Sequence, residues 1–79
     1  MKLQLFYDDG CGFCQSVLNT IKNLKIQDEI ELKNIREDAT FEKDLVIACG
    51  DSQVPTLFVD EKPMKESEAI KQFLVQSFM

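Results

Sequence analysis

The chain has 79 residues and a formal net charge of −5, and it is 44% hydrophobic, enough for one compact core, so we expect a single domain over residues 1–79. Its nine Lys and Arg residues are scattered, which argues against nucleic-acid binding, because phosphate recognition requires a basic face. No apolar run is long enough to span a membrane and the first residues do not form a signal peptide, so we expect a cytoplasmic protein without membrane contact.

The first part of the chain predicts a strand, a helix and a second strand. Residues 2–7 are rich in Leu, Phe and Tyr and alternate loosely, as a strand does. Residues 8–10, Asp-Asp-Gly, are typical of a turn. Apolar side chains then recur at helical spacing, which indicates a helix over residues 11–25. Residues 29–35 partly alternate charged and apolar side chains, as a half-exposed strand would. The apolar positions of the helix are Cys14, Val17, Leu18, Ile21 and Leu24.

A second helix is expected after this strand. Asp38 or Thr40 can cap its N-terminus, and Gly50 followed by Asp51 closes it. Cys49, near the C-terminal end, is expected to be a small buried apolar residue, because free cysteine is among the most buried residue types. The apolar face of this helix is expected to consist of Phe41, Leu45 and Ala48.

The last part of the chain predicts a hairpin and a final helix. Residues 54–59 form a short apolar run entered through Pro55, which favours a third strand. Residues 60–63 turn the chain into a brief fourth strand near residues 63–66. The final helix is expected to place Ala69, Ile70, Phe73, Leu74 and Phe78 on one side.

The elements follow the order β-α-β-α-β-β-α. The first three are expected to form a right-handed parallel βαβ unit, and the last two strands an antiparallel hairpin. This order predicts an α/β chain with a four-stranded mixed sheet and helices on both faces, which is the minimal thioredoxin fold.

The chain contains three cysteines and no histidine, which limits the catalytic and metal sites that it can form. The two-residue spacing between Cys11 and Cys14 is typical of redox and metal sites, whereas a disulfide-held secreted scaffold would carry an even number of cysteines at wider spacing. The pair lies where a strand passes into a helix, and the free amides and dipole of a helix N-terminus stabilise a thiolate. We therefore expect Cys11 to be the nucleophile and the inward-facing Cys14 to be the resolving cysteine, with Phe13 offering an apolar contact to a partner.

The alternative to a redox pair is a structural pair of thiols or half of a zinc site. Zinc requires four ligands, and without histidine Cys49 and carboxylates would have to complete the set. The acidic loop also matters, because Asp8 and Asp9 directly precede Cys11 and like charge disfavours a thiolate. The loop contains no Lys or Arg, so we expect the helix terminus to supply most of the activation.

These motifs together resemble the glutaredoxin branch of the thioredoxin superfamily. The resemblance rests on Cys-Gly-Phe-Cys at residues 11–14 and on Val54 and Pro55, which open the third strand. In that family the proline is cis and lies against the cysteine pair, and the preceding residue, Val54 here, presents its backbone to the cysteine-containing substrate. The resemblance implies a thiol–disulfide oxidoreductase that reduces protein disulfides or glutathione mixed disulfides. We expect a monomer with glutathione as co-substrate and without a tightly bound cofactor or metal.

Residues 65–70, Lys-Glu-Ser-Glu-Ala-Ile, resemble the glutathione-binding turn shared by glutaredoxins and the N-terminal domains of glutathione transferases. In those proteins a helix N-terminus and an acidic–serine pair hold the γ-glutamyl end of the tripeptide, which implies binding roles for Glu66, Ser67 and Glu68. Helix-start amides suit a carboxylate, and a carboxylate side chain pairs with an ammonium group. The alternative is that Ser67 only caps the helix and Glu68 only complements its dipole.

Some positions depart from the family pattern. Many glutaredoxins have a basic residue shortly before the first cysteine and a glycine pair before the final helix, and this chain has neither. Its Phe-Tyr-Asp-Asp-Gly-Cys segment also resembles another thioredoxin-like family, in which Tyr-Asp-Gly precedes a CxxC pair. The Gly-Phe pair between the cysteines occurs in monothiol glutaredoxins that carry an iron–sulfur cluster. The alternative function is therefore an iron–sulfur-cluster or glutathione-binding scaffold without strong reductase activity.

Overall fold

Four strands and three helices make up the structure, a computed structural model that describes all residues 1–79. The strands are β1 (Leu3–Tyr7), β2 (Glu31–Asn34), β3 (Thr56–Val59) and β4 (Lys62–Met64). The helices are α1 (Gly12–Leu24), α2 (Ala39–Cys49) and α3 (Ser67–Phe78), with a short 3-10 turn at Gln27–Glu29. The sheet has the order β2-β1-β3-β4, with β1 parallel to β2 and the other pairs antiparallel. The predicted element order and mixed sheet are confirmed.

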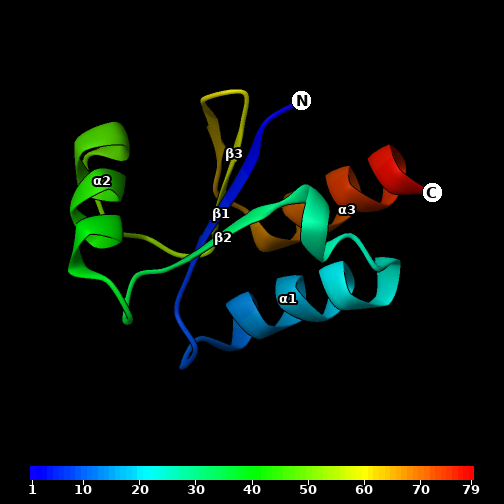
Figure 1. The fold of residues 1–79 in the computed structure, drawn as a ribbon, viewed down its shortest axis with the longest axis horizontal. Helices are drawn as coiled ribbons and strands as arrows, with labels where there is room; N and C mark the ends of the chain where they lie inside the picture. Colours follow the sequence, from blue (N-terminus) through cyan, green and yellow to red (C-terminus); the bar gives the residue numbers. More distant parts are fainter.

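The helices cover both faces of the sheet, as predicted. Figure 1 shows α1 and α3 side by side on one face and α2 alone on the other. The alternation of β1 explains this division, because Leu3 and Leu5 pack toward α1 and α3 whereas Phe6 packs toward α2. The larger core consists of Leu3, Leu5, Val17, Ile21, Ile26, Ile30, Leu57, Ile70 and Leu74.

The core beneath α2 is small. Phe6 and Phe58 meet edge to face, with ring centroids 5.4 Å apart, and Leu45 is the buried residue of the helix. Ala48, predicted to lie on the apolar face, is exposed. Cys49 takes the inward position because it lies four residues after Leu45, and it is half-buried rather than fully buried.

Several element boundaries differ from the predicted ones. β2 begins at Glu31 rather than at residue 29, because the 3-10 turn occupies the preceding residues. β3 begins at Thr56, after the proline that cannot donate to a strand ladder. Asp38 rather than Thr40 caps α2, since its Oδ1 accepts the Thr40 N–H at 2.9 Å.

The start of α3 also differs. β4 ends at Met64, and Glu66 occupies the N-cap position of α3 without a side-chain capping bond. Ser67 is the first helical residue, so the interpretation of Ser67 as the helix cap is wrong. The longest helix of the fold, α1, has 13 residues, and none of the helices is both long and apolar enough to cross a membrane.

Candidate functional site

The predicted cysteine pair lies at the N-terminal end of α1. Cys11 is the N-cap residue with an extended backbone, and Cys14 lies in the first turn. The Cys14 N–H points to the Cys11 sulfur, with an N–Sγ distance of 3.4 Å, so a helix-start amide faces that sulfur. Cys14 is fully buried and Cys11 is partly exposed, and both are free thiols. The site therefore combines an accessible outer sulfur with a protected inner one.

Burial is the main reason that the pKa of Cys14 is raised to about 12. A hydrogen bond with the Asp8 backbone lowers this pKa, whereas the neighbouring Cys11 and the Asp8 charge raise it further. Cys14 is therefore a neutral thiol at physiological pH. A neutral buried thiol is a poor nucleophile until a reaction at Cys11 brings a disulfide to it.

The free energy of unfolding should fall as pH rises from about 9 to about 12, because the native state holds the Cys14 proton more tightly than the unfolded chain does. The contribution of protonated Cys14 is complete below the unfolded pKa and is lost as pH rises through the native one. One linked proton changes the folding constant by at most about tenfold per pH unit. Urea unfolding of the parent and of Cys14→Ala measures this effect. A difference between them that stays constant up to pH 11 would contradict the raised pKa.

The loop before β3 lies against the outer sulfur. The Val54–Pro55 peptide bond is cis, as the resemblance implied, and the Cys11 thiol lies 3.9 Å from the Val54 carbonyl oxygen. Thr56 closes this loop, since its hydroxyl donates to the Gln53 carbonyl at 2.7 Å. The Val54 carbonyl, two residues before the first residue of β3, therefore lies next to the Cys11 sulfur.

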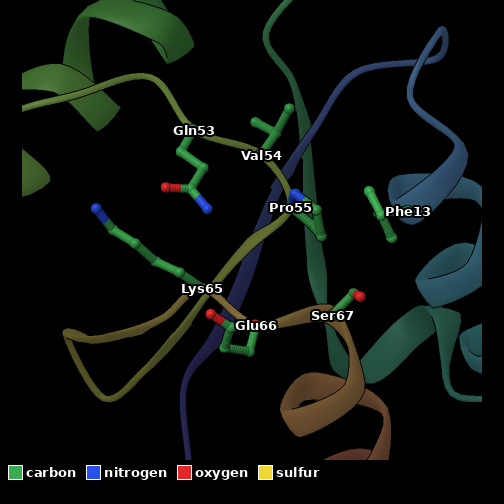
Figure 2. A pocket seen from close by; sticks show the side chains of 7 residues that line it. All are labelled: Phe13, Gln53, Val54, Pro55, Lys65, Glu66 and Ser67. Atoms are coloured by element: carbon green, nitrogen blue, oxygen red, sulfur yellow. The ribbon is translucent and has the colours of Figure 1, made fainter.

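A cavity of about 140 Å³ opens between the start of α1, this loop and the start of α3. In Figure 2, Lys65 extends along the same side of the cavity as Gln53, whereas Phe13 and Ser67 lie on the other side. Gln53 and Lys65 were not predicted as site residues, although Gln53 directly precedes Val54 and Lys65 is the first residue of the 65–70 motif. The lining consists of Phe13, Gln53, Val54, Pro55, Lys65, Glu66 and Ser67.

The cavity contains side chains of both charges. Lys65 pairs with Asp51 at 2.8 Å, and this contact lowers the pKa of Asp51 and raises that of Lys65. Glu66 forms no ion pair in the structure. The cavity is therefore lined by Glu66, a carboxylate without an ion-pair partner, and by Lys65, whose charge is already paired with Asp51.

Glu68, predicted to bind alongside Glu66 and Ser67, does not line this cavity. Its carboxylate lies 2.9 Å from Lys71 Nζ one turn along α3, and its side chain is 79% exposed. Because successive helical residues are rotated by about 100°, a helix that begins at Ser67 turns residue 68 away from the cavity.

One of the two carboxylates in the loop before Cys11 pairs with a cation from another part of the chain. Asp8 accepts from the Gly10 N–H at 2.9 Å and from Arg36 Nε at 2.7 Å, and these two contacts hold the pKa of Asp8 below its ordinary value. Asp9 accepts from the buried Asn34 side chain at 2.8 Å. The loop itself contains no Lys or Arg, but Arg36, from outside the loop, offsets the charge of Asp8.

The chain matches one protein family model and is similar to several solved structures. Residues 1–64 match the family model for glutaredoxin. An epsilon-class glutathione S-transferase from housefly is 26% identical with a TM-score of 0.76, over 98% of this chain and 35% of that chain. A diazinon-metabolizing glutathione S-transferase from silkworm is 22% identical with a TM-score of 0.75, over 99% and 38%. A thioredoxin-like protein is 17% identical with a TM-score of 0.72, over 99% and 100%.

These matches confirm the predicted thioredoxin-like fold. The chain spans little more than a third of the length of the two transferases. Among curated proteins, no sequence relative matches.

Proposed function

Because the chain belongs to the glutaredoxin family, we propose that it is a thiol–disulfide oxidoreductase that reduces protein disulfides or glutathione mixed disulfides. Family and fold together support a redox or glutathione-related function. The observation that carries the more specific proposal is the asymmetric thiol pair at the start of α1. Cys11 is accessible at a helix N-terminus, and the neutral Cys14 is buried directly behind it.

The proposed reaction has two exchanges. The Cys11 thiolate attacks one sulfur of the substrate disulfide, the S–S bond breaks, and the other sulfur leaves as a thiolate that takes a proton from solvent. Cys14 then loses its proton and attacks the Cys11 sulfur of the mixed disulfide. The substrate thiol is released, and Cys11 and Cys14 form a disulfide. Two electrons thus pass from the dithiol to the substrate, and two glutathione molecules regenerate the dithiol as they are oxidised to glutathione disulfide.

Two features of the site suit a peptide substrate. The Val54 backbone next to Cys11 offers its carbonyl to an extended chain, in the manner of strand addition. Phe13 is 69% exposed at the rim of the cavity and offers an apolar surface. A polypeptide that presents its cysteine to Cys11 would contact both.

Glutathione as co-substrate fits the rest of the cavity. The start of α3 has no side-chain capping bond, so first-turn amides near Ser67 are available to a carboxylate. The unpaired Glu66 carboxylate is suited to an ammonium group. The γ-glutamyl end of glutathione carries both groups on one carbon, which matches this pairing.

A comparison of two electron donors tests the proposed function. The oxidised protein is supplied with NADPH and either glutathione with glutathione reductase, or thioredoxin reductase, and a glutathionylated peptide serves as substrate. We expect turnover in the glutathione arm. Turnover only with thioredoxin reductase would replace the donor, and no turnover in either arm would contradict the proposed function.

A further inference from the structure

The Asp51 side chain links the loop before β3 to the segment before α3. Its Oδ1 accepts the Gln53 backbone N–H at 3.1 Å, and its Oδ2 lies 2.8 Å from Lys65 Nζ. Gln53 and Lys65 line the cavity at the start of α3, whereas Asp51 is not among the lining residues. Asp51 therefore holds, from outside, the one cation that lines the cavity.

The cavity offers different charges to the two ends of glutathione. Glu66 and Ser67 are proposed to hold the γ-glutamyl end, whereas Lys65 extends along the side of Gln53 (Figure 2). Glutathione carries a second carboxylate at its glycine end, and Lys65 is the only cation in the lining that can pair with it. Because Asp51 already pairs with Lys65, such a carboxylate must compete with Asp51.

We propose that Asp51 is a specificity-determining residue of this cavity: by holding Lys65, it disfavours substrates that bring a carboxylate to the side of Gln53. The inference rests on the proposed function, since it concerns which mixed disulfides react at Cys11. The ion pair is open to competition, because the side chains of Lys65 and Asp51 are 30% and 49% exposed. Specificity here comes from an opposing charge rather than from an added contact.

The Asp51→Asn variant separates the two contacts of this side chain. The asparagine oxygen can still accept the Gln53 N–H, but the uncharged amide no longer neutralises Lys65. Exposed ion pairs have modest effects, so the freed ammonium should raise the rate constant for a substrate with the glycine carboxylate about threefold to fivefold. A substrate with a carboxamide in place of that carboxylate should change by less than about twofold.

Two matched substrates test this role. One peptide is joined by a disulfide either to glutathione or to glutathione amide, and rapid mixing with the reduced protein measures the rate constant for release of the peptide thiol. The ratio of the two rate constants should rise about threefold to fivefold in Asp51→Asn. The double variant Asp51→Asn, Lys65→Gln should lose this gain. Asp44→Asn, an equal charge change at an exposed position on α2 outside the ion pairs, should keep the parent ratio.

The outcomes separate this inference from the proposed function. A parent protein that releases the peptide from neither substrate would contradict the proposed function itself. A parent that reacts, with an unchanged ratio in Asp51→Asn, would overturn only the role of Asp51. An equal gain on both substrates would also overturn it, because Asp51 would then act through the shape of the loop rather than through its charge. A partly unfolded variant lowers both rate constants alike, so the ratio still tests the inference.

Discussion

Replacing Cys11 with serine is expected to abolish thiol–disulfide exchange, whereas Cys14→Ser should retain an activity that depends on glutathione. Cys11 is the accessible sulfur at the start of α1, and a serine hydroxyl there is a far weaker nucleophile. Loss of a nucleophile costs several orders of magnitude in rate. In Cys14→Ser, the mixed disulfide still forms on Cys11, and a second glutathione molecule from solution can release it.

Two kinds of substrate distinguish the role of Cys11 as nucleophile from that of Cys14 as resolving cysteine. Both variants are assayed on a glutathionylated peptide and on a protein disulfide, with glutathione reductase to follow turnover. Cys14→Ser should fail on the protein disulfide, which needs an internal resolving thiol, and should work on the glutathionylated peptide. Cys49→Ser is the matched control, because it makes the same chemical change at a half-buried position in the core beneath α2. Equal loss in the Cys11 and Cys14 variants on the glutathionylated peptide would contradict the proposed roles.

The thiol pair and its surroundings could be predicted because their determinants are local. The two-residue spacing of the cysteines, the strand before them and the apolar period after them lie within one short stretch of sequence. Helical periodicity alone predicts that Cys14 faces inward with Val17 and Ile21, and all three are buried. The burial of Cys14 and the exposure of Cys11 follow from that geometry.

Contacts between distant parts of the chain could not be predicted in the same way. Asp8 and Arg36 are 28 positions apart, so a survey of the loop alone finds no cation. They meet because β1 and β2 are parallel neighbours, with Tyr7 opposite Asn34, so the residues that follow both strands emerge at the same edge. The strand pairing was predicted, but the register that aligns these particular residues was not.

The remaining differences between the predicted and the observed site depend on the residue at which a helix begins. A helix rotates by about 100° per residue, so the face of each side chain depends on where the helix begins. Because α3 begins at Ser67 with Glu66 as its N-cap, Glu66 and Ser67 line the cavity and Glu68 pairs with Lys71 instead. Local propensity favours Ser67 as the N-cap, because Ser is a preferred N-cap residue and Glu is not, so the observed boundary could not be predicted from local sequence.

The second large effect that we expect is a loss of glutathione binding when the residues at the start of α3 are changed. If Glu66 and Ser67 hold the γ-glutamyl end of glutathione, the Glu66→Gln, Ser67→Ala double variant removes a charge-assisted contact and a hydrogen bond. Contacts to charged groups contribute about 1.5–3 kcal/mol, so the efficiency on glutathionylated substrates should fall about tenfold to a hundredfold. The variant should still reduce a small uncharged disulfide with dithiothreitol as donor, because Cys11 and Cys14 are unchanged.

Glu68→Gln provides the matched control for this variant. It removes the same charge from a position two residues after Glu66 on α3, but outside the cavity, where the carboxylate pairs with Lys71 in solvent and contributes little. Neither variant removes a side-chain capping bond from α3, so thermal unfolding should change little in either. An equal loss in Glu68→Gln would mean that glutathione reaches the outer face of α3. If the double variant handles glutathionylated substrates as well as the parent does, the cavity does not hold glutathione, and a protein reductase becomes the better candidate for the electron donor.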